Sequence, residues 1–97
     1  MEERISLWYL ANNAIESSRN INGGKFYGKA CLYSINGWKF VRSYNTIVCC
    51  ITPAGEYRKL WAGWSSTTCQ HVRKLLGVSF RMHDTVYAMP ALSEVLA

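Results

Sequence analysis

The stretch YSINGWKFVRSYNTIVCCITPAG, residues 33–55, decides the fold class because it places turn signals among aromatic and β-branched residues. Asn36-Gly37 is the strongest of these signals, since a type I′ turn needs two residues with positive φ and Asn-Gly adopts them at least cost. It predicts a hairpin that joins a strand over residues 26–35 to the strand that follows the turn. Pro53-Ala54-Gly55 turns the chain again, and residues 56–64 are predicted to return as a third strand. The segment therefore indicates an antiparallel three-stranded β-meander.

The predicted second strand begins at Trp38 and continues to Ile51. Its last five residues, from Ile47 onward, are apolar on both faces, which favours a central strand covered on each side. Such a strand would exceed the usual length, and the sequence between Ser43 and Thr46 is polar, so we expect a bend near Tyr44.

Helical periodicity occurs on either side of this meander. Apolar residues at spacings of three and four predict an amphipathic helix over residues 5–15, followed by a loop over 17–24; they are Leu7, Trp8, Ala11, Ala14 and Ile15. Thr67 with Gln70 fits a capping box that starts a second helix, and Gly77 offers its stop. Its sheet-facing residues are predicted to be Cys69, Val72, Leu75 and Leu76, and its water-facing residues Gln70, Arg73 and Lys74.

The C-terminal tail carries two weaker signals. Residues 78–80 suggest a short strand, and Pro90 suits the first position of a brief last helix that carries Leu92, Val95 and Leu96. The predicted architecture is α+β, a single compact domain over residues 1–97 in which an N-terminal helix and the helix after the third strand pack on the meander.

The composition narrows the class of protein. Apolar residues make up 49% of the chain and aromatic residues 13%, which argues against disorder. The longest apolar run, from Ile47 to Ile51, is far shorter than the roughly 18 residues that cross a bilayer.

The acidic start, Glu2-Glu3, is unlike a secretory signal, so we expect an intracellular protein with reduced cysteines. Adjacent Cys49 and Cys50 should point to opposite faces of a strand and serve as small core residues.

Positive charge gathers in the middle of the chain. The formal net charge is +5, and Glu56 is the only acid between Ser17 and His83, whereas ten basic residues lie there: Arg19, Lys25, Lys29, Lys39, Arg42, Arg58, Lys59, Arg73, Lys74 and Arg81. A basic surface of this kind suits a nucleic acid or an acidic protein patch, or has no specific partner.

The hydroxyl row Ser65-Ser66-Thr67-Thr68 at the start of the second helix has two interpretations. Backbone N–H groups, these hydroxyls and the nearby His71, Arg73 and Lys74 could bind an anion. The glycine pattern of a phosphate-binding loop is missing, so helix capping explains Thr67 equally well. Both interpretations stay open from the sequence.

Catalytic and metal chemistry find little support. Cys69, His71 and His83 match no common zinc spacing, and a thiol–histidine pair lacks the acid that would orient its base. We expect no enzyme, no metal and no cofactor.

Aromatic and basic residues alternate along the predicted strands, which favours base stacking and phosphate contacts. The alternative is that the aromatic face packs under the two helices. The alternating residues are Tyr27, Lys29, Tyr33, Trp38, Lys39, Phe40, Arg42, Tyr57, Arg58, Lys59 and Trp61.

Three sequence blocks, FYGKA (residues 26–30), SYNTIV (43–48) and WxGxSxTTxxHV (61–72), resemble a group of short proteins of unassigned function from bacteriophages and prophages. The resemblance implies a small non-enzymatic phage or mobile-element protein in the host bacterial cytoplasm. Such a protein would bind and inhibit a host defence complex, as an anti-CRISPR inhibitor does with a nuclease or its guide complex.

Two other function hypotheses stay open. One is a basic module that binds RNA or DNA directly, and the other is a self-assembling protein such as a homodimer. No membrane partner is expected. The residues predicted to contact the partner are Trp61, Trp64, Ser65, Ser66, His71, Arg73, Lys74, Arg58 and Lys59.

Overall fold

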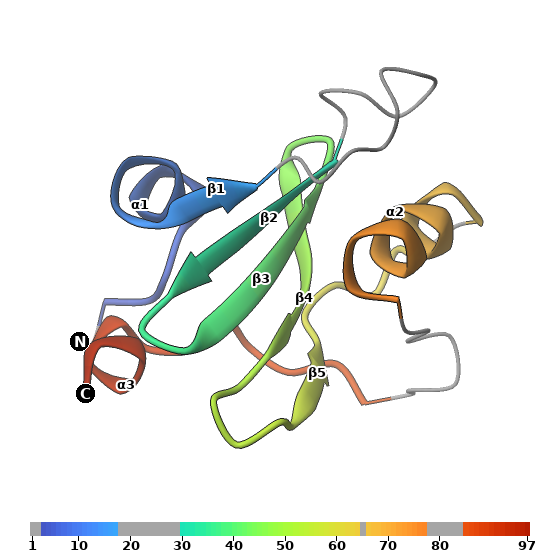
Figure 1. Cartoon of the computed structure of the whole chain (residues 1–97). Helices are drawn as coiled ribbons and strands as arrows, with labels where there is room; N and C mark the ends of the chain where they lie inside the picture. Colours follow the sequence, from blue (N-terminus) through green and yellow to red (C-terminus); the bar gives the residue numbers. More distant parts are fainter. Residues whose placement is uncertain (1–2, 18–29, 65, 78–84) are drawn as a thin grey trace.

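The computed structural model describes residues 3–17, 30–64, 66–77 and 85–97. Within these residues the chain forms a five-stranded antiparallel sheet in the order β1-β2-β3-β4-β5 (Figure 1). The strands are β1 (Ile15–Ser17), β2 (Ala30–Ile35), β3 (Trp38–Ser43), β4 (Thr46–Ile51) and β5 (Tyr57–Lys59), and the helices are α1 (Leu7–Asn13), α2 (Ser66–Leu76) and α3 (Leu92–Leu96). The α+β antiparallel meander is confirmed, but the predicted count of three strands is wrong.

The Asn36-Gly37 hairpin forms as the sequence predicts. Asn36 and Gly37 take φ values of 48° and 86°, and Ile35 pairs with Trp38 across the turn. Positive φ at both central residues is the geometry of a type I′ turn. Residues 26–29 of the predicted first strand lie outside the described residues.

The predicted bend near Tyr44 is a complete reversal of the chain. Ser43 pairs with Thr46 and Tyr44 takes a φ of 55°, so one predicted strand becomes the two strands β3 and β4. A bulky residue at positive φ is rare, which is why no clear hairpin signal could be recognised at this position from the sequence. Arg42 supports the turn by donating from Nη1 to the Tyr44 carbonyl oxygen at 2.5 Å.

The N-terminal helix is shorter than predicted and is followed by a strand. The hydroxyl of Ser6 caps α1 by accepting from the Tyr9 N–H at 3.1 Å. At the other end, the side-chain amides of Asn12 and Asn13 donate to carbonyl oxygens of the preceding turn. Asn competes for backbone hydrogen bonds in this way and disfavours helix continuation. The chain therefore leaves the helix before Ile15, which begins β1 instead.

The buried face of α1 also differs from the prediction. Leu10 is fully buried, whereas Trp8 is 72% exposed and Ile15 is 75% exposed. Leu7 and Ala14 pack against the core as predicted. The apolar spacing was real, but the short helix places Trp8 on its outer side.

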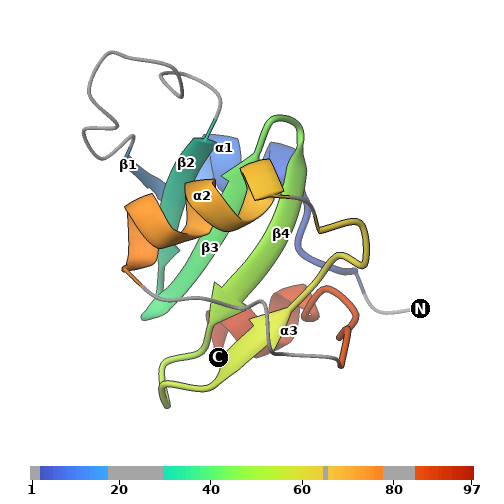
Figure 2. The ribbon, with the colours of Figure 1, turned by 90° about the vertical axis from the view of Figure 1, so that its right-hand side faces the viewer.

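The helices cover both faces of the sheet, with α1 and α3 on one face and α2 on the other (Figures 1 and 2). Buried residues accordingly form two core clusters. The first lies under α1 and α3 and contains Leu10, Cys31, Tyr33, Trp38, Phe40, Ile47, Cys50 and Val95 with Ile5. The second lies under α2 and contains Ala30, Leu32, Val41, Val48, Cys49, Val72 and Leu75.

A β-bulge in β4 increases the number of side chains that face α2. Val41 pairs with Cys49 and Arg42 with Ile47, which leaves Val48 as the extra residue. Val48 and Cys49 therefore both join the cluster under α2, whereas Cys50 joins the opposite cluster. The prediction that Cys49 and Cys50 face opposite sides is confirmed, as is the burial of β4 on both faces.

Several smaller predictions are corrected. The third strand ends at Lys59 rather than at residue 64, although the Leu60 N–H still donates to the Val48 carbonyl oxygen at 2.9 Å. Pro90 precedes Ala91, the N-cap of α3, and so lies outside the helix. The predicted strand at residues 78–80 lies outside the described residues, as does the predicted loop beyond Ser17. None of the helices in the described ranges has the length and apolar character needed to cross a bilayer.

Candidate functional site

A hollow of about 600 Å³ lies between the end of β5, the loop that follows it and α2. Its lining combines two cationic side chains with an aromatic ring and small polar groups: Lys59, Ala62, Trp64, Ser66, Cys69, Gln70 and Arg73. Four of these residues belong to α2 and lie three, four and seven positions after the first of them, which places them along one side of that helix.

Lys59 is held at the hollow by Trp64. The Lys59 Nζ atom lies 5.2 Å from the centroid of the Trp64 ring, within the range of a cation–π interaction. Trp64 in turn packs against the core cluster that contains Val72 and Leu75. The core therefore holds the Trp64 ring in place, and the ring positions the Lys59 ammonium group beside the hollow.

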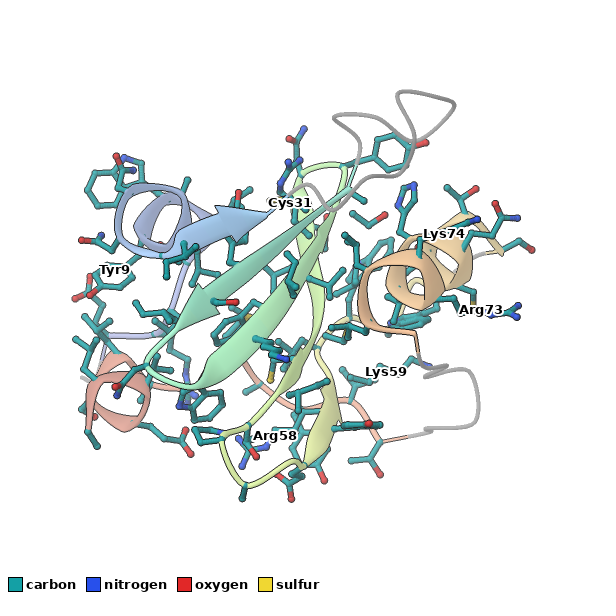
Figure 3. The ribbon with its side chains drawn as sticks, in the orientation of Figure 1. Tyr9, Cys31, Arg58, Lys59, Arg73 and Lys74 are labelled. Carbon is teal, nitrogen blue, oxygen red and sulfur yellow. The ribbon has the colours of Figure 1, made fainter. Side chains whose placement is uncertain are left out.

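A second hollow of about 440 Å³ lies against α2 and shares part of its lining with the first. Gln70 and Arg73 line both hollows, and Lys74 and Gly77 complete the second. Figure 3 shows Lys59, Arg73 and Lys74 on the α2 side of the sheet. We call these two hollows, which share Gln70 and Arg73, the α2 groove. Neither Arg73 nor Lys74 has a carboxylate partner within ion-pair distance among the residues that the structure describes.

Trp61 lies in the loop before α2 and directly precedes Ala62, a lining residue of the groove. Its side chain is 38% exposed, and its ring lies so close to Gly63 that a Cβ atom there would come within 2.6 Å of the indole. Only glycine permits this approach. The Trp61 ring therefore packs on Gly63, and the residue between them, Ala62, lines the groove.

Arg58, another predicted contact residue, does not line the groove. Its Nε atom lies 2.5 Å from Glu56 Oε1, and its Nη1 atom lies 3.8 Å from Glu94 Oε2. The guanidinium lies over the rings of Trp38 and Tyr87, at 5.6 Å and 5.4 Å from their centroids. The hydrogen bond to Glu56 is the main cause of the raised pKa of Arg58. Arg58 and Lys59 point to opposite faces because they are neighbours in a strand (Figure 3).

His71 is fully buried, so it cannot serve as the surface contact that the sequence suggested. Its Nδ1 atom lies 2.7 Å from Ser43 Oγ, and the Tyr44 ring packs against it at a centroid distance of 5.5 Å. The histidine therefore fastens α2 to the end of β3.

The hydroxyl row is also distributed differently from the prediction. Helix α2 begins at Ser66, so Thr67 lies inside the helix and is not its cap. Thr68 is buried, and Ser66 lines the groove. Ser65, the remaining predicted contact, lies outside the described residues, as does His83. Cys69 was predicted to face the sheet, but it is partly exposed and lines the groove, because Thr68, His71, Val72 and Leu75 take the buried positions.

The structure thus brings five residues of the predicted set to the groove: Lys59, Trp64, Ser66, Arg73 and Lys74. Trp61 is not a lining residue, but it directly precedes Ala62, which is one. Sequence reasoning missed Ala62, Cys69 and Gln70 as lining residues. The spacing of Ser66, Gln70 and Arg73 by four and three positions could have identified Gln70.

The other thiols are poorly suited to chemistry. Burial raises the pKa of Cys50 to about 12 and also raises the pKa of Cys49, with the neighbouring Cys50 as a second cause for Cys49. Both thiols stay protonated at neutral pH, and a protonated thiol is a poor nucleophile and metal ligand. Among the described residues no three His, Cys, Asp or Glu side chains gather in a way that could hold a metal ion.

Residues 9–86 match the model of a family of unknown function, DUF8033. The chain belongs to this family. The range that matches DUF8033 includes every strand of the sheet and all of α2, so the α2 groove lies within it. No curated protein and no solved structure matches the chain.

Proposed function

We propose that this DUF8033 protein is a non-enzymatic binding protein whose target is a nucleic acid. The supporting observation is the α2 groove, where the Lys59 ammonium lies over the Trp64 ring and Arg73 lines the same hollow. Lys59 and Arg73 come from two different elements, β5 and α2, and none of the described residues that line the groove carries a carboxylate. Phosphate groups are the anions that Lys and Arg bind most often in nucleic-acid interfaces.

In the cell, this activity would serve to disable a host defence ribonucleoprotein by holding its nucleic-acid component. The basic groove suits such a target better than mimicry of DNA would, because mimicry requires an acidic surface. The proposed partner is therefore the guide or target nucleic acid of a defence complex.

A salt titration with fluorescently labelled RNA and DNA tests the proposed activity. We expect the logarithm of the association constant to fall linearly with the logarithm of salt concentration, because phosphate contacts release counterions. Lys59→Gln and Arg73→Gln should each weaken binding and reduce this slope. Lys39→Gln is the matched control, because Lys39 is exposed, lies outside the groove and carries the same charge. Affinity that does not depend on salt, or equal loss with all three variants, would reject the groove as the binding site.

A second candidate function, direct inhibition of a defence nuclease through protein contacts, is favoured by Trp8 and Ile15. Both side chains are apolar and more than 70% exposed, at 72% and 75%. Exposed aromatic side chains commonly anchor protein interfaces. Pull-down from a host lysate with and without nuclease separates the two candidates. A defence nuclease that is still captured after nuclease treatment, and lost with Trp8→Ala but kept with Lys59→Gln, would favour the protein-directed function.

A further inference from the structure

We infer that the α2 groove is built for single-stranded rather than double-stranded nucleic acid, with phosphates held along α2 and one unpaired base stacked on Trp61. This inference rests on the proposed function. It adds to that function the class of nucleic acid and says which residues bind phosphates and which residue stacks on a base.

The phosphate positions follow from the shared lining of the two hollows. Arg73 lines both of them, Lys59 only the first and Lys74 only the second. A chain that passes from one hollow to the other therefore meets three cations in succession. Lys59 and Arg73 reach the first hollow from different elements, β5 and α2, so a phosphate there would be held from two sides.

The base position follows from the two tryptophans. Trp64 packs against the core and has the Lys59 ammonium over its ring. It therefore positions Lys59 and does not offer its ring to a base. Trp61 is exposed, and the close approach of its ring to Gly63 limits its movement. A pre-positioned ring loses little conformational freedom when a ligand stacks on it.

Stacking on a side chain requires a base that is not paired within a duplex. A duplex would offer this groove its phosphates only, and Trp61 would contribute little. The arrangement of three cations and one exposed ring therefore predicts a preference for single strands.

Cys69 supplies a reporter inside the groove. It is partly exposed and lines the first hollow, whereas Cys31, Cys49 and Cys50 are buried. A strand that occupies the groove should shield this thiol from an alkylating reagent in the unaltered protein.

The test compares a 12-nucleotide single-stranded RNA and DNA with the corresponding duplexes. We expect single strands to bind at least about tenfold tighter, and Trp61→Ala to weaken single-strand binding about 5- to 150-fold, the range found for loss of one stacked base. Trp61→Phe should stay within a few-fold of the original protein, because it keeps an aromatic ring. Trp8→Ala, on the opposite face of the sheet, should change nothing. In parallel, saturating single strand should slow iodoacetamide modification of Cys69.

The outcomes separate the two proposals. Equal affinity for single strands and duplexes, or no effect of Trp61→Ala on single-strand binding, would overturn the inference and leave the proposed function standing. Binding with no protection of Cys69 would also overturn it, and this readout does not depend on any variant folding. No binding of any of the four oligonucleotides at low salt would overturn both proposals.

Discussion

The Nδ1 atom of His71 lies 2.7 Å from the Oγ atom of Ser43, and both residues are buried. His71 belongs to α2, and Ser43 ends β3. Two of the sequence blocks, residues 43–48 and 61–72, therefore meet at this contact. Their shared role here is structural, because the contact fixes the helix whose outer side lines the groove.

We expect Ser43→Ala to lower the free energy of unfolding by about 1–2 kcal/mol, because it leaves a buried imidazole nitrogen without this hydrogen bond. His71→Ala should cost more, about 2–4 kcal/mol, because it also removes buried packing. Urea denaturation measures both. The double variant should cost clearly less than the sum of the two. Simple additivity would mean that the two side chains do not interact in solution.

Arg58 and Lys59 should have opposite effects on stability and binding. Arg58→Gln removes a guanidinium that lies over two rings and should lower the free energy of unfolding by about 1–2 kcal/mol. It should leave oligonucleotide affinity nearly unchanged, because Arg58 faces away from the groove. Lys59→Gln should weaken binding with little loss of stability. Oligonucleotide titration and urea denaturation of both variants in one buffer test whether Arg58 acts on stability and Lys59 on affinity. Equal loss of affinity in the two variants would place Arg58 at the binding site.

The chain contains four cysteines, and Cys69 alone should react rapidly with a thiol reagent in the native state. Absorbance with Ellman's reagent should show one fast thiol and three slow ones, because Cys31, Cys49 and Cys50 are fully buried. Cys69→Ser should abolish the fast phase. All four thiols should react at once in denaturant, which is the internal control. A second fast thiol in the native protein would contradict the packing of the sheet.

Stability should fall as the pH rises above about 9, the ordinary pKa of a cysteine thiol, because burial raises the pKa of Cys50 to about 12 in the folded protein. Between these values the unfolded chain loses the Cys50 proton and the folded protein keeps it. The folded state is therefore progressively disfavoured, at up to about 1.4 kcal/mol per pH unit for one thiol. Denaturation at pH 8 to 11 should show a shallower decline for Cys50→Ala than for the unaltered protein. Cys69→Ala is the control and should keep the full slope.

Asn36 ties the first hairpin to the C-terminal segment as well as forming its turn. Its Nδ2 atom donates to the carbonyl oxygens of Val95 at 2.7 Å and Ala97 at 3.0 Å. Asn36→Gly preserves the positive φ but removes both bonds, and we expect a loss of about 1–2 kcal/mol in the free energy of unfolding. Asn36→Asp should be at least as destabilising, since a carboxylate cannot donate to these oxygens. If Asn36→Gly is as stable as the original protein, the two side-chain hydrogen bonds do not contribute to stability, and Asn36 serves only to form the turn.

The sequence determined the local features for which a few neighbouring residues suffice. Asn36-Gly37 specified its turn, Gly77 ended α2 with a φ of 74°, and adjacent Cys49 and Cys50 faced opposite sides. Alternation and helical spacing also identified the antiparallel meander and its two main helices. These features follow from backbone geometry over a few residues, which any folded context preserves.

Only the tertiary structure decided which side chains form the groove. Tyr44 adopts a positive φ because β3 and β4 pair on either side of it and its ring packs on His71, a contact 27 positions away that no local pattern reveals. The β4 bulge then adds Val48 to the face that α2 covers, and α2 settles with His71 inward and Cys69 outward. Burial against a distant surface, and not helical periodicity alone, therefore set the rotation of α2 and made Arg73 line the same hollow as Lys59.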